Sequence, residues 1–508
     1  MSQTRLLTLH NGDALYRSEL PLLPYADYRQ QLLAEIADGG RVAACFANPS
    51  GAENELDLYT LLARDQQEDL VLLRTRIGDQ FPSLTPDCTQ LQLFEREIAE
   101  QYGVVPEGHP WFKPVRFHPS WQPERDAWGR DTSHHPIPGA MNFYRVEGEE
   151  VHEVAVGPVH AGVIEPGHFR FQCHGEEVMH LEISLGYQHR AIEQRLIGGP
   201  HPLTPFQLET AAGDTSIGHM TAWCRVCEAL AGSDIPPRGD RLRAIALELE
   251  RLANHVGDLG AIAGDVGFLP TASYCGRLRG DFLNLTAELC GNRFGRGLVR
   301  PGGTTFDCAP ELAERILQRL EPVARNTRGA LELLFDTPSV LARLEGTGKV
   351  SVETALELGL VGVAAKACGL RRDVRLNHPV GVWSKNFQPV PLEESGDVFA
   401  RANIRRKEVY ASIDWIRKQL RTLPEGPHKE SLPPLRANML AVTLVEGWRG
   451  EIVHVALTDE HGRLARYKIV DPSFHNWSGL AMALRGEQIS DFPLCNKSFN
   501  LSYCGFDL

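Results

Sequence analysis

The chain has 508 residues, of which 43% are hydrophobic and 23% are charged, a composition typical of soluble globular proteins and not of disordered or membrane-spanning ones. This length exceeds one ordinary core, so we expect two or three domains of about 100 to 200 residues each. The formal net charge of -13, with no stripe of Lys and Arg, disfavours nucleic-acid binding and favours protein partners.

No segment of the sequence predicts export or a transmembrane helix. The first residues, MSQTRLLTLHNGD, lack a sustained apolar run and a cleavage site. The longest apolar candidate, from Leu356, is interrupted by Glu357 and Lys366 and is shorter than the roughly 20 residues that a spanning helix needs. We therefore expect a cytoplasmic protein whose 11 cysteines are mostly buried, reduced thiols.

Residues 1–125 predict a small α+β domain. Residues 25–39 have helical spacing and end on a glycine, whereas residues 41–48 and 68–77 are apolar runs of strand length. A second helix is expected from about Thr89 to Tyr102. Residues 126–148 follow as a linker rich in Pro, Gly, Asp and His, in which the neighbouring His134 and His135 indicate solvated side chains more than a metal site.

Residues 149–508 predict a mainly helical bundle with flanking antiparallel strands, so the whole chain is expected to be of the α+β class. GHFRFQCHG and EEVMHLEISL alternate as a hairpin around Gly175. The long helical segments expected next are residues 215–232, 238–267, 272–295, 310–335 and 397–420. Strands return over residues 437–470, followed by a short helix over 476–486 and a polar tail.

The stretch from Gly157 to His219 is unusually rich in titratable side chains. These are His160, His168, His174, His180, His189, Arg190, Glu193, Asp214 and His219. Histidines beside ordered Arg and Glu side chains suit proton handling or metal ligation. A strand-rich surface with ordinary polar histidines is the alternative interpretation.

Five separated motifs in the same order resemble one family. They are GPVHAGVIEPGHFRF, LGYQHRAIEQ, RPGGTTFD, GLRRDVRLNHP and EGWRGEIVHVALTDEHGRLARYKIVDPSFHNW. Together they are similar to the large subunit of membrane-bound NiFe hydrogenases, including that of formate hydrogenlyase, and to the homologous quinone-site subunit of respiratory complex I. The N-terminal unit, with FPSLTP and FEREIAEQYGVVPEGHP, resembles the small peripheral-arm subunit of complex I, so a fusion of the two is expected.

The four cysteine ligands of the hydrogenase members are not found at their places in this sequence. The resemblance implies an early RxCGxC and a late DPCxxC, whose soft thiolates hold nickel and iron. In the register set by Gly213 and His219, the early positions carry Ala212 and Thr215; at the late ones SFNLSYCG has Ser502 and Gly505. We therefore expect no NiFe centre.

Two cysteines do form a CxxC pair, Cys224 and Cys227, one helical turn apart. Their apolar helical surroundings favour core packing. A four-thiol site that adds Cys495 and Cys504 stays an open alternative.

The resemblance implies roles for further residues. His160 and His168 flank the loop that approaches the quinone in complex I relatives, and a histidine donor suits a quinone headgroup. The motif here is closer to the hydrogenase form, so a quinone contact is left open. Arg190, Glu193, Asp214, Asp307 and Arg375 match positions near the metal cavity, where they form either a proton path or an ion-pair network. His189 and His219 complete the candidate catalytic set.

The function implied by the resemblance is that of a peripheral redox subunit, on the inner face of the cell membrane, of a complex I-like oxidoreductase that couples electron transport to proton or ion movement. Expected partners are a small subunit that carries the iron–sulfur clusters and membrane subunits of antiporter-like and anchoring type. An active hydrogenase with unorthodox ligands and a non-catalytic coupling or scaffold subunit are the alternatives.

The sequence ends in NLSYCGFDL. Metal-bearing relatives are made with an extension beyond the late motif that is removed after nickel insertion. We expect this tail to need no such processing, to pack its aromatic residues Phe499, Tyr503 and Phe506 on the helical core, and to place residues 500–504 near Asp214.

Overall fold

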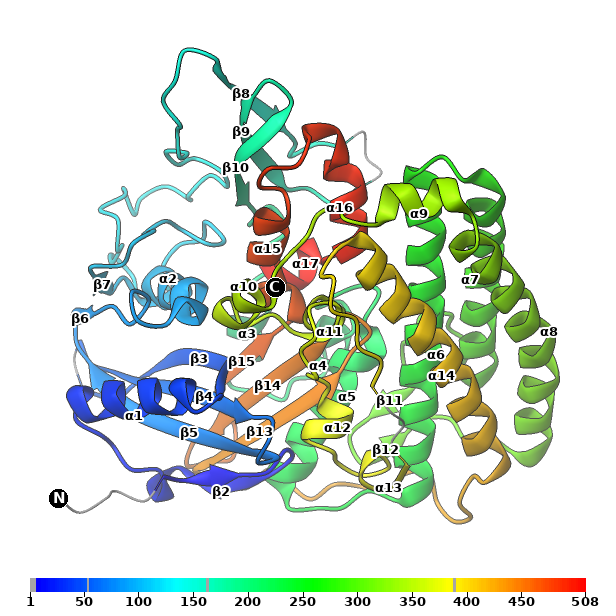
Figure 1. The fold of residues 1–508 in the computed structure, drawn as a ribbon. Helices are drawn as coiled ribbons and strands as arrows, with labels where there is room; N and C mark the ends of the chain where they lie inside the picture. Colours follow the sequence, from blue (N-terminus) through cyan, green and yellow to red (C-terminus); the bar gives the residue numbers. More distant parts are fainter. Residues whose placement is uncertain (1–5, 53, 161–163, 387–389) are drawn as a thin grey trace.

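The computed structural model describes residues 6–52, 54–160, 164–386 and 390–508 (Figure 1). Its N-terminal part is a four-stranded antiparallel sheet in the order β1-β5-β4-β3, covered by α1 (Tyr25–Ala37). The strands are β1 (Thr8–Leu9), β3 (Arg41–Pro49), β4 (Leu56–Arg64) and β5 (Asp69–Ile77). Helix α2 (Gln92–Tyr102) ends at Gly103, whose φ of +67° suits a glycine stop. This confirms the predicted α+β unit.

A segment without helix or strand connects this part to the rest, as the sequence predicts for residues 126–148. It follows the short parallel pair of β6 (Gln80–Pro82) and β7 (Val105–Glu107). The segment packs on its neighbours: the Trp128 ring stacks on Phe112 at 4.9 Å, and the Tyr144 amide donates to Glu182.

The predicted hairpin is β9 (His168–His174) and β10 (Glu177–Ser184), turning at Gly175 with φ +59°. Strand β8 (Val151–Val156) pairs with the other side of β9, and this three-stranded sheet projects at the top of Figure 1.

A bundle of long helices forms the other half of the molecule (right side of Figure 1). Its helices are α5 (Ser216–Ala231), α6 (Pro237–Asp265), α7 (Leu269–Cys290), α8 (Pro310–Phe335) and α14 (Val398–Arg421). Leu242, Ile245, Leu249 and Leu252 of α6 are all buried, as their spacing predicts. None of the helices in the described parts of the chain combines the length and apolarity that a membrane crossing requires.

Short helices and a hairpin connect the long elements. The helices are α3 (Ile192–Leu196), α4 (Thr204–Leu208), α9 (Pro338–Leu344), α10 (Val352–Glu357), α11 (Gly362–Ala367), α12 (Val374–Asn377) and α13 (Trp383–Asn386). The hairpin pairs β11 (Val299–Arg300) with β12 (Gly303–Thr304). A Cβ atom on Gly302 would lie 1.9 Å from the Glu430 carbonyl oxygen, so this turn requires glycine.

A second antiparallel sheet, in the order β15-β14-β13-β2, joins the two ends of the chain. Its strands are β13 (Met439–Glu446), β14 (Glu451–Thr458), β15 (Leu464–Val470) and, from the N-terminal part, β2 (Ala14–Tyr16). Arg466 on β15 also donates to the Ala47 carbonyl on β3. The boundary predicted at residue 125 therefore separates two parts of the sequence. In space these two parts share a sheet and a buried interface.

The predicted short helix is α15 (Pro472–Ala483). The tail after it is also largely helical, with α16 (Phe492–Phe499) and α17 (Tyr503–Asp507) where the sequence indicated only a polar tail. The Asp471 carboxylate caps α15, so this helix begins four residues before the predicted start. Phe499, Tyr503 and Phe506 are buried, which confirms their predicted packing.

Candidate functional site

The turn that carries Ala212 and Thr215 leads directly into α5 and is held by polar contacts. The Thr215 hydroxyl donates to the Asp214 carboxylate at 3.0 Å and accepts from the Trp448 indole N–H at 3.1 Å. The Ser216 hydroxyl donates to the Glu209 carbonyl at 2.7 Å. These side chains satisfy one another and the backbone, as expected for a polar turn placed where thiolates would otherwise stand.

Arg449 connects this turn to the C-terminal tail. Its two Nη atoms donate to the two carboxylate oxygens of Asp214, each at 2.7 Å, and its Nε donates to the Asn500 carbonyl at 2.5 Å. Burial opposes ionisation of Asp214, but Arg449 outweighs it and lowers the pKa of that carboxyl. The tail therefore lies beside Asp214, as predicted.

The late positions carry no metal-binding group. The Ser502 hydroxyl accepts from the Gly505 amide at 2.9 Å and so caps α17. A Cβ atom on Gly505 would lie 2.7 Å from the Asp471 carboxyl carbon, so Asp471 fills the space beside this glycine. With a methyl group, two engaged hydroxyls and a glycine at the four ligand positions, the donor set does not fit nickel or iron.

The cysteines of the CxxC pair and of the tail lie in different surroundings. Cys224 and Cys227 are buried inside α5, Cys495 lies against Gly348, and Cys504 contacts Ser502 and Gly213. Burial raises the pKa of Cys224 to about 12 and that of Cys504 to about 11, which disfavours thiolates. Within the described ranges, no three His, Cys, Asp or Glu side chains form a metal site.

His219 is the centre of a fully buried hydrogen-bonded chain. Its Nε2 donates to Asp471 at 3.1 Å, and its Nδ1 accepts from His454 Nε2 at 3.1 Å. The Tyr467 hydroxyl donates to His454 Nδ1 at 2.7 Å. Burial and then His219 depress the pKa of His454, so this ring is neutral and each link has one donor and one acceptor. Burial raises the pKa of Tyr467 well above its usual value, so its hydroxyl keeps its proton and the chain holds the His454 and His219 rings in position for Asp471.

Glu250 on α6 lies next to the turn that carries Asp214. The sequence feature that could have identified it is an acidic residue among the buried positions of an amphipathic helix. Its carboxylate accepts from the Ile217 and Gly218 amides at 2.8 and 3.2 Å. Burial, opposed by these amides and supported by the nearby charge of Asp214, raises the pKa of Glu250 to about 8. A buried carboxyl that titrates near neutral pH beside an ion pair suits proton exchange.

The other predicted histidines hold the 157–168 loop and the tail in place. His160 Nε2 donates to the Gly167 carbonyl at 2.9 Å, and His168 Nδ1 donates to the Gly157 carbonyl at 3.1 Å. His189 Nδ1 donates to the Asp507 carbonyl at 2.7 Å; burial and His118 lower the pKa of His189 to about 3. Residues 161–163 of the predicted histidine-flanked loop lie outside the described residues.

Arg190 and Glu193 have structural surroundings. Arg190 donates to the carbonyls of Thr210, Ala211 and Cys504, and so ties the early turn to the tail. Glu193 is buried between Arg466 and Lys468 at 3.0 and 3.1 Å. Burial alone would raise the pKa of Glu193, but the two cations outweigh it and lower this pKa to about 2. Glu193 therefore belongs to an ion-pair network.

Arg375 and Asp307 do not contact Asp214. Arg375 pairs with Asp373 and Glu248 at 2.8 and 3.0 Å in a buried charge cluster with Lys366 and Glu408. Asp307 pairs with Arg238 at the start of α6 at 2.6 Å. Arg238 stands 12 residues before Glu250, which binds the turn after Asp214, on the same helix, or about 18 Å away. The expectation that Asp307 lies at the cavity is therefore wrong, because the order of the motifs does not fix which helix end they occupy.

Comparison with known families supports the same assignment at both ends of the chain. The family described as "Respiratory-chain NADH dehydrogenase, 49 Kd subunit" matches residues 265–441 and 436–507, and the "30 Kd subunit" family matches residues 31–133. The carbon monoxide-induced hydrogenase of Rhodospirillum rubrum is 32% identical over 353 residues, which cover 68% of this chain and 96% of that protein. Formate hydrogenlyase subunit 5 of Escherichia coli (strain K12) is 29% identical over 434 residues, 84% of this chain and 76% of that protein.

A solved structure shows the same fold. A chain of the membrane-bound sulfane sulfur reductase, an archaeal respiratory membrane complex, superposes with a TM-score of 0.67 at 22% identity, covering 72% of this chain and all of that one (100%). Together with the sequence matches, this places the protein in the family of the large subunits of membrane-bound hydrogenases and the 49 kDa subunit of respiratory NADH dehydrogenase, with a 30 kDa-type domain fused at its N-terminus.

Proposed function

We propose that the chain is a peripheral subunit of a membrane-bound oxidoreductase complex in which an ion-paired, proton-exchanging site stands where hydrogenase relatives hold nickel and iron. The observation that carries this proposal is the Arg449 bridge, which binds Asp214 of the early turn and Asn500 of the tail together. In this proposal the Arg449 guanidinium neutralises the Asp214 carboxylate, at the position where a metal dication lies in hydrogenase relatives.

Two groups of side chains supply the proton chemistry in this proposal. Glu250 takes up and releases a proton near neutral pH, next to Asp214, which stays ionised. The second group is the buried pair of His219 and Asp471 in the same region, with the His219 ring held in position by His454 and Tyr467. We assign no proton transfer and no quinone contact to His160, because its Nε2–H already donates to the Gly167 carbonyl.

Electrons have to come from a partner, because the chain carries no iron–sulfur motif of its own. Exposed apolar side chains gather in two segments that border the site: Val159 and Ile164 in the loop after β8, and Ile197, Leu203 and Phe206 around α3 and α4. Exposed apolar groups of this kind mark protein contacts. We assign them to a small iron–sulfur subunit, with anchoring and antiporter-like membrane subunits holding the whole assembly at the inner face of the membrane.

Purified complex should contain no stoichiometric nickel in this chain. The reason is that Ala212, Thr215, Ser502 and Gly505 offer no thiolate, and the buried Cys224 and the half-buried Cys504 both have raised pKa values. Elemental analysis of the complex from nickel-replete cells measures this directly. About one nickel per chain, together with hydrogen-dependent dye reduction that is lost in Cys504→Ser, would instead establish an active hydrogenase.

Leu203→Asp should reduce recovery of a cluster-bearing partner in native co-purification several-fold, because it places a charge in the apolar segment beside the site. Leu269→Asp is the matched control, since Leu203 and Leu269 have nearly equal exposed fractions of 64% and 66% and both stand at helix starts. Leu269 begins α7 in the helical bundle, so this variant should keep the partner. An equal loss of the partner in both variants, or no loss in either, would contradict the assignment of the Leu203 surface to the iron–sulfur subunit.

A further inference from the structure

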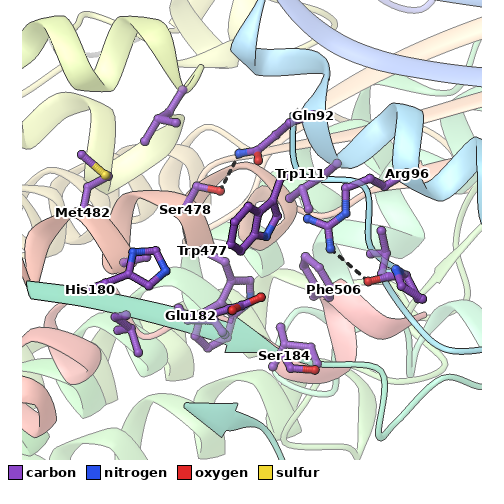
Figure 2. Close-up of a pocket in the computed structure, with 18 of the residues that line it drawn as sticks. Gln92, Arg96, Trp111, His180, Glu182, Ser184, Trp477, Ser478, Met482 and Phe506 are labelled. Carbon is purple, nitrogen blue, oxygen red and sulfur yellow. Dashed lines mark hydrogen bonds between the residues drawn. The ribbon is translucent and has the colours of Figure 1, made fainter. Parts of the chain in front are cut away.

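A hollow of about 200 Å³ lies between the 30 kDa-type part and the rest of the molecule (Figure 2). Its walls come from α2 and residues 111–115 on one side, and from β10, α15 and α17 on the other. Leu181, Ile183, Pro114 and Val115 make much of the lining apolar, with the rings of Trp111 and Phe506 among them. It is separate from the Asp214 turn, although Phe506 belongs to the tail helix that packs beside that turn.

Three buried polar atoms around this hollow have no hydrogen-bond partner within the described parts of the chain. They are Ser184 Oγ, Trp477 Nε1 and His180 Nε2. Ser184 and Trp477 are 4% and 3% exposed, so water reaches neither freely. An indole N–H only donates and a hydroxyl can donate, so the missing partner is an acceptor. Unmatched donors of this kind are costly unless a ligand or ordered water binds them.

The hollow also carries a buried guanidinium, that of Arg96, which Glu100 and Glu182 influence only from beyond ion-pair distance. Arg96 donates to the Lys113 and Pro114 carbonyls at 2.7 and 2.9 Å and forms no ion pair with any described acid. In Figure 2 its guanidinium points towards Phe506. Of the other charged side chains here, Glu182 pairs with Lys113 at 2.5 Å, and Arg485 adds a second positive charge to the lining. Burial lowers the pKa of Arg96 to about 10, which still leaves it protonated at neutral pH.

We propose that this hollow is a binding site for a small organic carboxylate with a flat apolar body. The carboxylate would bind Arg96 and the unmatched donors, and the flat body would lie between the apolar walls and the aromatic rings. The volume is below the roughly 300 Å³ at which drug-sized sites begin, so a nucleotide or a whole quinone with its tail is excluded. The inference does not depend on the proposed proton-exchanging site.

Benzoate is a suitable probe, with benzamide as its neutral isostere. Titration of the purified protein by calorimetry, with Trp111 and Trp477 fluorescence as a second readout, should show saturable binding of benzoate and at least about tenfold weaker binding of benzamide, because a charge-assisted pair is lost. In Arg96→Gln, benzoate should weaken by about tenfold while benzamide binds as before. Arg241→Gln is the control, since Arg241 also binds a carbonyl, that of Thr422, but lines a different pocket.

Ser184→Ala removes only the unmatched hydroxyl of a side chain that is 4% exposed, and it leaves the rings of the hollow unchanged. It should weaken benzoate and provides the test if Arg96→Gln does not fold. Absence of saturable benzoate binding, equal affinity for benzoate and benzamide, or unchanged benzoate affinity in the folded variants would each overturn the proposal.

Discussion

Replacing Arg449 by leucine should lower the free energy of unfolding by about 3 kcal/mol and free the C-terminal tail. The substitution removes both hydrogen bonds to Asp214, the one to the Asn500 carbonyl and the stacking of the guanidinium on the Trp448 ring at 3.9 Å. Breaking a buried pair leaves a carboxylate without its cation, at a cost of about 3–5 kcal/mol. The Asp214 side chain is 34% exposed, which keeps the loss at the lower end.

Chemical denaturation measures the stability, and hydrogen exchange over residues 500–508 measures whether the tail is released. Arg417→Leu is the control, because Arg417 pairs with Glu321 and Asp414 at the surface and should cost no more than about 1 kcal/mol. Equal losses in the two variants, or unchanged protection of the tail in Arg449→Leu, would show that Arg449 does not hold the two segments together.

The elements that the sequence predicted well are those set by local periodicity. Helix α6 and the β9–β10 hairpin were confirmed because their apolar spacing and turn residues lie within one segment. The tail helices α16 and α17 were missed because they are short and depend on packing of Phe506 against Phe474, 32 positions earlier in the chain. The pairing of β2 with β13 was equally out of reach, since it joins opposite ends of the chain.

The residues of the candidate site were likewise predictable only where a local motif marks them. Asp214 and His219 could be selected because they stand at the vacated early motif. Arg449 and Asp471, which complete their environment, lie 235 and 252 positions further along the chain, and no local pattern connects them. Glu250 was accessible in principle, because an acid among the buried residues of an amphipathic helix requires a partner. Which end of α6 reaches the site depends on the tertiary fold, and for this reason Asp307 was misplaced.

Glu250→Gln should gain stability relative to the parent as the pH rises from about 4.5 to about 8. The pKa of Glu250 is about 8 in the folded state against an ordinary value of 4.5, with burial the main cause. Between these two pH values the folded parent holds a proton that the unfolded chain has released. Its stability therefore falls as pH rises, by up to about 1.4 kcal/mol per pH unit for this one group. Glutamine does not titrate. Its single oxygen accepts from one of the two amides that now donate to separate carboxylate oxygens, so the substitution adds a constant offset and removes the pH dependence.

The quantity to measure is the difference in free energy of unfolding between Glu250→Gln and the parent, taken at pH values from 4 to 9, because other titrating groups cancel in it. This difference should rise between pH 4.5 and about 8 and then level off. Glu314→Gln, at an exposed position on α8, should show no such rise. A difference that stays flat or falls with pH would mean that Glu250 is ionised throughout. The proposed proton-exchanging site would then lose Glu250 as a group that changes its charge near neutral pH.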